Sequence, residues 1–143
     1  MEKLLISGCL LGYNCKYNGK NNYNPLVEEL KKKYELVVIC PEAEGGLTTP
    51  RNPSEIRGDI VVSNQGVDVT EEFKRGAKIA FNRCKERGCT KALLKEGSPS
   101  CGSTKIYDGS FTGVKIPGEG MTVRLLRKLN IEIYSENDIE KLL

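Results

Sequence analysis

The sequence predicts an α/β protein, a single-domain, three-layer open parallel sheet of the Rossmann-like or flavodoxin-like kind with helices on both faces. Its expected strands are short and continuously apolar, which is typical of parallel strands that are covered on both sides. They alternate along the chain with amphipathic helical segments. A length of 143 residues agrees with one domain that buries its own core. Because no repeat or linker interrupts this pattern, we expect residues 1–143 to form one domain.

Each expected strand of the sheet is a short apolar run bounded by polar or turn-forming residues. The clearest is the run LVVI within residues 34–39. A further possible strand, residues 59–63, is followed by the turn sequence NQG. The four strands of the sheet are expected at residues 4–6, 34–39, 91–95 and 131–134.

Helix boundaries are expected where capping residues precede an apolar stripe. Asn24 is the expected N-cap of a first helix, with Pro25 at its first position. Thr70 is the expected N-cap of the longest helix, which ends before Gly88 at about residue 87. A third helix is expected after the GEG sequence at 118–120, and a last turn or two in the tail. The segments 12–24 and 45–53 are expected as irregular loops, and 107–113 as a loop or hairpin.

The composition excludes several kinds of site. The chain has no histidine, so Ser-His-Asp triads, Cys-His pairs and His-ligated zinc are excluded. A net charge of +3 is too small to indicate direct nucleic-acid binding. No apolar run approaches the roughly 20 residues that span a bilayer, and the first residues do not resemble a signal peptide. We therefore expect a cytoplasmic protein without a membrane partner.

The six cysteines point to metal binding or thiol chemistry, because the chain is larger than a disulfide-framework domain. No C-x-x-C pair is present. Cys84 falls on the apolar stripe of the long helix and is expected in the core. Cys89 follows the residue that ends this helix and is expected to be structural or at the surface.

Three other cysteines, Cys9, Cys40 and Cys101, come at or just after the carboxyl ends of expected strands. The carboxyl ends of parallel strands share one edge of the sheet, so these thiols are expected to converge there. Three thiolates without histidine fit zinc or an iron–sulfur cluster. In a [4Fe–4S] cluster held by three cysteines one iron stays open, and it would bind a soft substrate atom such as sulfur. Cys15 lies in the same loop region as Cys9 and is either a fourth ligand or a bystander.

Acid–base candidates at the same edge are Glu42, Ser98 and Ser100. The two serines flank Pro99, where they are also suited to capping a turn. Glu44 and Glu96 are more simply explained as solvated loop charges.

Two further features are candidates for contacting substrate. Arg51 lies between Pro50 and Pro53 in a stiff loop, where it could orient an anionic or carbonyl group. Gly118 and Gly120 precede a helix and could expose their N–H groups to an oxyanion.

At these residues the chain resembles the domain-of-unknown-function family 523, some members of which are thiouracil desulfidases. The resemblance covers essentially the whole chain in order. In the first segment Lys16 and Asn18 stand where Arg and Asp are expected in a CRYDG-like motif. The matching segments are CLLGYNCKYNG (9–19), CPEAEGGLTTPRNPSEI (40–56), GVDVTEEFKRGA (66–77), LLKEGSPSCG (93–102), IYDGSFTG (106–113) and GEGMT (118–122).

The resemblance implies an α/β enzyme with an oxygen-sensitive [4Fe–4S] cluster, carried on the three cysteines that match Cys9, Cys40 and Cys101. It implies that the open iron takes the sulfur of a small thiolated substrate while water replaces it at carbon, giving uracil and hydrosulfide from thiouracil. Glu42 and one of Ser98 and Ser100 would assist. No flavin or nicotinamide site is required, and neither a complete G-x-G-x-x-G nor a P-loop is present.

Two other hypotheses remain open from the sequence. The first is a non-catalytic iron–sulfur or zinc protein, such as a sulfur carrier or metal sensor, in which Cys15 completes a four-thiolate site. The second is a metal-free thiol enzyme with Cys9 or Cys101 as nucleophile. The oligomeric state is left open.

Overall fold

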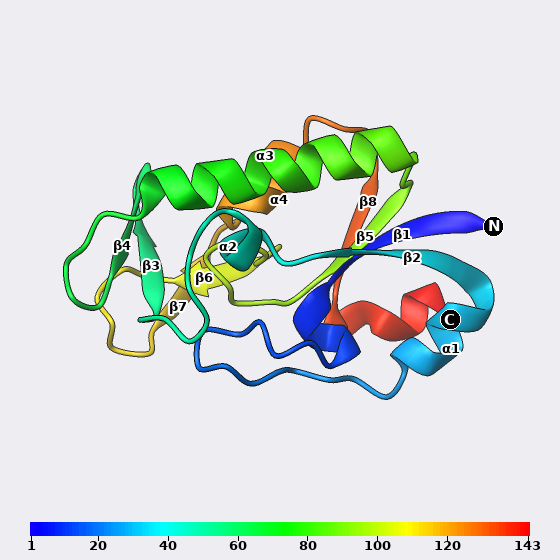
Figure 1. Cartoon of the computed structure of the whole chain (residues 1–143), viewed down its shortest axis with the longest axis horizontal. Coiled ribbons are helices and arrows are strands. Elements are labelled where there is room, and N and C mark those ends of the chain that lie inside the picture. The colour runs from blue at the N-terminus through cyan, green and yellow to red at the C-terminus, as the bar shows by residue number, and fades with distance from the viewer.

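A four-stranded sheet forms the centre of the computed structural model, which describes all residues 1–143 (Figure 1). Every neighbouring pair of its strands is parallel. The prediction of an open parallel sheet is therefore confirmed. The strand order is β2 (Tyr34–Ile39), β1 (Glu2–Ser7), β5 (Lys91–Leu94) and β8 (Glu132–Ser135).

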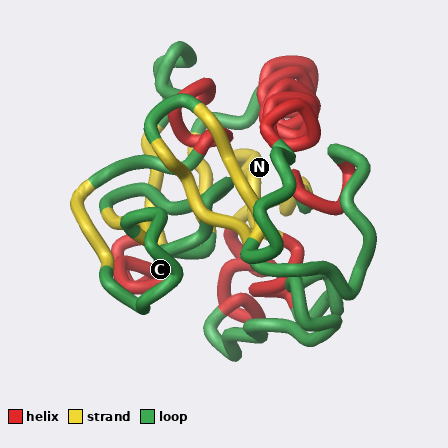
Figure 2. The backbone as a smooth tube through the Cα atoms, turned by 90° about the vertical axis from the view of Figure 1, so that its left-hand side faces the viewer, coloured by secondary structure: helices red, strands yellow, loops and turns green.

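Helices cover both faces of this sheet, as the sequence predicts. α3 (Thr70–Arg87) and α4 (Met121–Leu126) lie on one side, above the strands in Figure 1. α1 (Val27–Lys33) and the 3₁₀ segment η2 (Glu136–Leu142) lie on the other side. Figure 2, in which α3 is seen along its axis, shows helices on either side of the strands.

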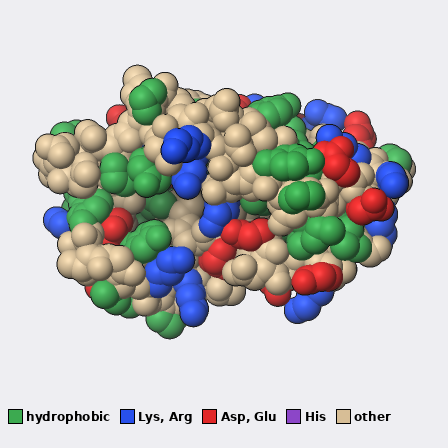
Figure 3. All heavy atoms as spheres, turned by 90° about the horizontal axis from the view of Figure 1, so that it is seen from below, with side chains coloured by type: hydrophobic (Ala, Val, Ile, Leu, Met, Phe, Trp, Pro, Cys, Tyr) green, Lys and Arg blue, Asp and Glu red, His purple; other side chains and the backbone are tan.

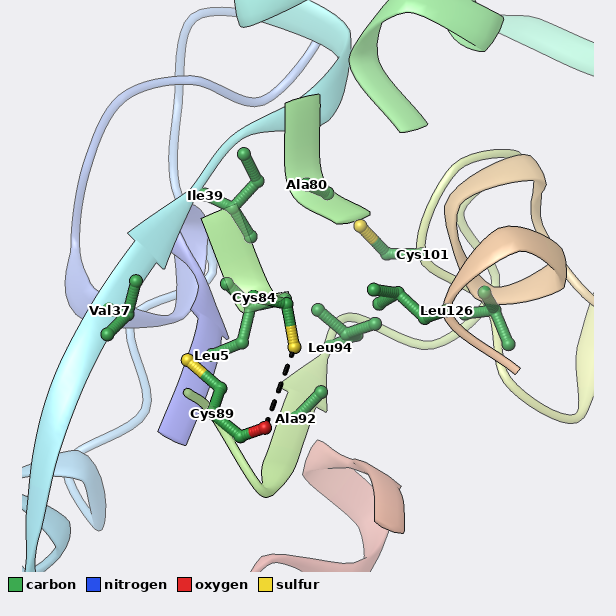
Figure 4. Close-up of a cluster of buried hydrophobic side chains, with 11 residues drawn as sticks. Leu5, Val37, Ile39, Ala80, Cys84, Cys89, Ala92, Leu94, Cys101 and Leu126 are labelled. Carbon is green, nitrogen blue, oxygen red and sulfur yellow. Dashed lines mark hydrogen bonds between the residues drawn. The ribbon is translucent and has the colours of Figure 1, made fainter. Parts of the chain in front are cut away.

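Two clusters of apolar side chains fill the space between the sheet and the helices on its two faces. Successive strand residues point to opposite faces, and β1 accordingly sends Leu5 into the cluster under α3 and α4 (Figure 4). Its neighbours Leu4 and Ile6 pack in the cluster beneath α1 and η2. All three are fully buried. Burial on both faces is what makes the strand read as a continuous apolar run in the sequence.

Two small antiparallel ribbons lie at the end of the molecule toward which β1 points (Figure 1). The first pairs β3 (Ser54–Arg57) with β4 (Ile60–Ser63). The second pairs β6 (Lys105–Tyr107) with β7 (Lys115–Pro117), so the expected loop or hairpin is a hairpin. β4 matches the possible strand at 59–63, whereas its partner β3 was not predicted.

The two predicted N-caps are wrong in detail. α1 begins at Val27 rather than Pro25, and Asn24 Oδ1 accepts a hydrogen bond from the Leu26 N–H (3.0 Å) in the turn that leads into the helix. Thr70 is the first residue of α3 rather than its cap. Its Oγ1 accepts from the Val61 N–H at 2.9 Å, which ties the helix to β4.

The remaining elements are short. η1 (Gly8–Leu11) follows β1 directly, and the single turn α2 (Pro41–Glu44) follows β2 within one residue. The long helix ends as predicted at Gly88, whose φ of 69° is left-handed. None of the helices has the length and apolar character needed to span a membrane.

Candidate active site

A cavity of about 540 Å³ opens beyond the carboxyl ends of β1, β2 and β5. The chain that follows β1 runs to α1 on one face of the sheet, whereas the chains that follow β2 and β5 run to α3 and α4 on the other face, so a crevice forms where they part. The surface seen from below is hollowed, with acidic and basic side chains gathered around the hollow (Figure 3). The residues that line the cavity come from the strand ends on one side and from the two small ribbons on the other.

The structure places the three predicted thiols in this cavity. Cys9 lies in η1 after β1, Cys40 follows β2 directly, and Cys101 lies in the loop after β5. Cys15 lines the same cavity, and the Cys40 Sγ donates to the Cys15 carbonyl oxygen at 3.6 Å. The four cysteines therefore line one cavity, and they come from three segments that are far apart in the sequence.

The surroundings of these thiols shift their pKa values in opposite directions. Burial raises the pKa of Cys101 to about 12 and also raises the pKa of Cys9. A hydrogen bond from Cys15 lowers the pKa of Cys40 and raises that of Cys15. Since the thiolate is the metal-binding form of cysteine, binding of a metal in this cavity must release the protons of these thiols.

Glu42 is held beside these thiols by two partners. Its side chain is 17% exposed. Arg51 Nε donates to Glu42 Oε1 at 3.2 Å, and Ser98 Oγ donates to Glu42 Oε2 at 3.3 Å. Burial raises the pKa of Glu42, while the neighbouring Arg51 opposes this shift. The structure thus joins the predicted carboxylate, one predicted serine and the predicted arginine in one group.

Arg51 is largely committed to partners within the protein. Its side chain is only 8% exposed. Besides Glu42, it donates to the Cys15 carbonyl oxygen (2.9 Å), the Thr48 carbonyl oxygen (3.3 Å) and Thr49 Oγ1 (3.0 Å). Arg51 therefore fixes Glu42 relative to the Cys15 loop. It also lines the cavity, and its contact with substrate stays a prediction.

The two candidate serines face different surroundings. Ser98 lines the cavity, and its Oγ accepts from the N–H groups of Ser100 and Cys101, both at 3.0 Å. Ser100 is 1% exposed and pairs with Thr122 Oγ1 at 2.8 Å. Only Ser98 is brought to Glu42.

Gly118 and Gly120 do not line the cavity. A Cβ atom on Gly120 would collide with the Ser100 carbonyl oxygen, and one on Gly118 would lie 2.9 Å from the Ile106 side chain. These glycines allow the chain to pack closely against the Cys101 loop. Their contact with substrate stays a prediction, which their position outside the cavity lining does not support.

The expectation that Glu44 and Glu96 are solvated loop charges is wrong. Glu44 accepts from the Cys40 N–H (3.0 Å) and forms an ion pair with Arg83 (2.6 Å). Both contacts connect α2 to its surroundings, so Glu44 helps to fix the chain at Cys40.

Glu96 organises the loop that carries Ser98 and Cys101. Its Oε1 accepts from the N–H groups of Ser103 (2.9 Å), Thr104 (3.1 Å) and Lys105 (3.1 Å). Burial by itself would raise the pKa of Glu96, but these N–H donors and the Thr104 hydroxyl lower it to about 2. Two small polar residues, Ser103 and Thr104, seven and eight positions after the glutamate are the sequence signal that could have revealed this closed loop.

The far wall of the cavity was missed by the sequence reasoning. It includes Glu55 of β3, together with Tyr107, Phe111 and Lys115 of the β6–β7 hairpin. None of these residues follows a strand of the central sheet, so an argument from strand ends does not find them.

The donor set fits an iron–sulfur cluster. The cavity offers four cysteines and no histidine. No three His, Cys, Asp or Glu side chains are arranged to hold one metal ion. The thiolates of a four-iron cluster bind separate irons, so they need to line a cavity and need not meet at one point. The volume also lies in the usual range of small-molecule sites.

Comparisons with known proteins agree with this arrangement. A family model described as 2-thiouracil desulfurase matches residues 4–138. An uncharacterized protein, YbbK of Bacillus subtilis (strain 168), is 39% identical over 150 residues, which cover 98% of this chain and 99% of that protein. A solved structure described as the [4Fe-4S]-dependent thiouracil desulfidase TudS is 45% identical. It superposes with a TM-score of 0.93 over 99% of this chain and 95% of that one.

Proposed function

The chain belongs to the 2-thiouracil desulfurase family, and we propose that it is a [4Fe–4S]-dependent thiouracil desulfidase. The reaction converts 2-thiouracil and water into uracil and hydrogen sulfide. One carbon–sulfur double bond is replaced by a carbon–oxygen double bond, and no electrons are gained or lost. The observation that carries the proposal is the joining of Cys9, Cys40 and Cys101 with the Glu42–Ser98 pair in one cavity.

Cys9, Cys40 and Cys101 are the proposed ligands. When bound, a cluster on three thiolates supplies an iron without a protein ligand, which is a soft Lewis acid toward the substrate sulfur. The Ser98 side chain supports this ligand set, because its Oγ accepts a hydrogen bond from the N–H group of Cys101.

Glu42 is the proposed proton-transfer group. Water must lose its protons as its oxygen bonds to the ring carbon, and the departing sulfur must gain them. The carboxylate of Glu42 accepts a proton from water. The hydroxyl of Ser98, hydrogen-bonded to Oε2, orients this carboxylate and relays the proton to the departing sulfur. Arg51 is a positioning residue, since it holds the other oxygen of Glu42.

The substrate is proposed to be a small thiolated ring.

All six cysteines are free thiols, which supports a reducing compartment such as the cytoplasm as the place of action. The net charge of +3 is too small to favour nucleic acid as a partner.

The first test is anaerobic analysis of iron and acid-labile sulfide in reconstituted protein, followed by sulfide release from 2-thiouracil. We expect about four irons and four sulfides per chain, together with turnover. Cys40→Ser should lose all three properties, whereas Cys84→Ser in the core should keep them. Full sulfide release by iron-free protein would contradict the proposal.

A second candidate function rests on the contact between Cys15 and Cys40. If Cys15 were a fourth ligand, the site would be closed and the protein would be a non-catalytic iron–sulfur protein. Cys15→Ser separates the two functions. Loss of iron together with an inactive wild-type protein favours the closed site, and retained iron with turnover favours the desulfidase.

A further inference from the structure

The wall of the cavity that carries no cysteine has one acidic side chain with an unusual pattern of contacts. Glu55 lies in β3, is 8% exposed and lines the cavity. Its Oε1 accepts from the N–H groups of Gly109 (3.0 Å) and Phe111 (3.2 Å). One half of the carboxylate is therefore occupied in holding the hairpin loop.

The other oxygen, Oε2, has no hydrogen-bond partner in the chain. The structure has no buried side-chain oxygen or nitrogen atom without a partner, so Oε2 is not sealed in the protein. Glu55 lines the cavity and is 8% exposed, so we infer that Oε2 faces the cavity space. Arg57, on the same strand, does not neutralise it, since the Arg57 Nε donates to the Gly109 carbonyl oxygen at 2.8 Å. Glu55 thus presents an acceptor that the protein itself leaves unused.

Two aromatic residues, Phe111 and Tyr107, line the same cavity as Glu55. Phe111 has a φ of 58°, which is uncommon for a residue other than glycine. Glu55 holds its N–H group, and the Arg57 guanidinium lies 5.8 Å from its ring centroid. A planar ring with N–H groups is the ligand that suits an aromatic surface combined with a carboxylate oxygen.

We propose that Glu55 determines substrate specificity by accepting a hydrogen bond from a ring N–H of the thiolated substrate at Oε2. The inference rests on the proposed function, because the thiouracil ring supplies both the sulfur and the N–H donors. It assigns the two walls of the cavity different tasks. The cysteine wall acts on the sulfur, and the ribbon wall selects a ring whose nitrogen still carries its hydrogen.

Glu55→Gln tests this assignment without removing the loop contact. The amide oxygen still accepts from Gly109 and Phe111, and those two N–H groups force the amide nitrogen toward the cavity. The cavity-facing group thereby changes from an acceptor to a donor. We expect kcat/KM for 2-thiouracil to fall about 10- to 100-fold, mainly through KM. The melting temperature and the iron content should stay unchanged. Glu86→Gln, on the exposed side of α3, is the matched control and should behave as wild type.

Methylated substrates give a second readout that needs no variant. For the wild-type protein, one of the two compounds 1-methyl-2-thiouracil and 3-methyl-2-thiouracil should have a kcat/KM about 10- to 100-fold below that of 2-thiouracil. That compound is the one whose methyl group replaces the hydrogen of the N–H that Glu55 binds. Glu55→Gln should lose that preference. Equal kcat/KM for all three compounds in the wild-type protein would overturn the inference, as would wild-type kinetics in Glu55→Gln.

Binding of 2-thiouracil, measured by equilibrium dialysis on the same proteins, separates this inference from the proposed function. One outcome is that the wild-type protein binds 2-thiouracil but releases no sulfide, and that Glu55→Gln binds it at least tenfold more weakly. This outcome supports the role of Glu55 and overturns the desulfidase function. Turnover that is equal in both proteins overturns Glu55 alone. If wild-type protein binds no 2-thiouracil, both fail.

Discussion

Cysteines lie at both ends of the central sheet, and the two groups have different surroundings. At the amino end of β5, Cys84 and Cys89 pack among apolar side chains, and the Cys84 Sγ donates to the Cys89 carbonyl oxygen at 3.8 Å (Figure 4). At the carboxyl end, Cys101 lies on the boundary between this cluster and the cavity. Burial alone does not distinguish Cys101 from Cys89, since Cys101 is 4% exposed and Cys89 6%. What differs is the polar loop that follows a strand at one end only.

The loops at the carboxyl end bring charged groups to the thiols. Glu42 and Ser98 are joined there, and Arg51 and Glu96 hold the loops that carry them. The pair at the amino end packs among apolar side chains, and the charges near Cys89, those of Arg87, Lys3 and Glu35, form ion pairs with one another. A thiol in this fold therefore acquires chemistry from the groups that the strand-end loops place beside it.

The sharpest way to break this comparison is to replace two equally buried cysteines. Cys101→Ser should abolish iron and labile sulfide and lower sulfide release at least about 10³-fold, since it removes a proposed ligand. Cys89→Ser should keep both, because this side chain lies away from the cavity. The measurement is iron and sulfide per chain in anaerobically reconstituted protein. Equal iron in the two variants would show that the ends of the sheet are not functionally different.

The next largest effect is expected for the carboxylate at the carboxyl end. Glu42→Gln keeps the size of the side chain and can still receive the Arg51 hydrogen bond at its amide oxygen. It removes the proton acceptor, so kcat should fall about 10²- to 10⁴-fold with the iron content unchanged. Steady-state kinetics and the visible absorbance of the cluster measure the two quantities separately. A variant with full kcat would assign the proton transfer to another group.

The position of the thiols could be predicted from the sequence because it depends on topology. An apolar run predicts a strand, parallel strands share one edge, and Cys9, Cys40 and Cys101 each follow a strand end. The same reasoning could not choose between Ser98 and Ser100. They are two positions apart on one turn, and only the turn geometry sends Ser98 to Glu42 and Ser100 to Thr122.

Contacts between distant segments were the other part that the sequence could not supply. Arg51 donates to the carbonyl oxygen of Cys15, which lies 36 residues earlier in the chain, so its guanidinium already has a partner within the protein. Glu55 holds the N–H of Gly109 from 54 residues away. No local pattern encodes either partner, because both depend on how loops pack over the sheet.

The two serines provide a comparison within one turn. Ser98→Ala should lower kcat about 10- to 100-fold, because it removes a hydrogen bond to Glu42 and the acceptor for the Cys101 N–H. Ser100→Ala leaves the buried Thr122 hydroxyl without its partner, which should destabilise the protein by about 1–3 kcal/mol and leave kcat within about twofold. Kinetics and urea unfolding of both variants test the contrast. A larger loss of kcat in Ser100→Ala would reverse their roles.

The smallest expected effect is on stability and comes from the glutamate that closes the Cys101 loop. The pKa of Glu96 is lowered from its ordinary 4.5 to about 2, so its charged form contributes stability above about pH 4.5. That contribution declines as the pH falls toward 2, where the folded carboxylate also becomes protonated. Since the carboxylate is partly exposed, we expect Glu96→Gln to cost about 1–2 kcal/mol at pH 7. The difference from wild type should narrow at pH 3. Urea unfolding at both pH values measures it, with Glu86→Gln as the control that should show no difference at either. A difference that does not change with pH would mean that the charge of Glu96 does not hold the loop, and that the shape of its side chain is sufficient.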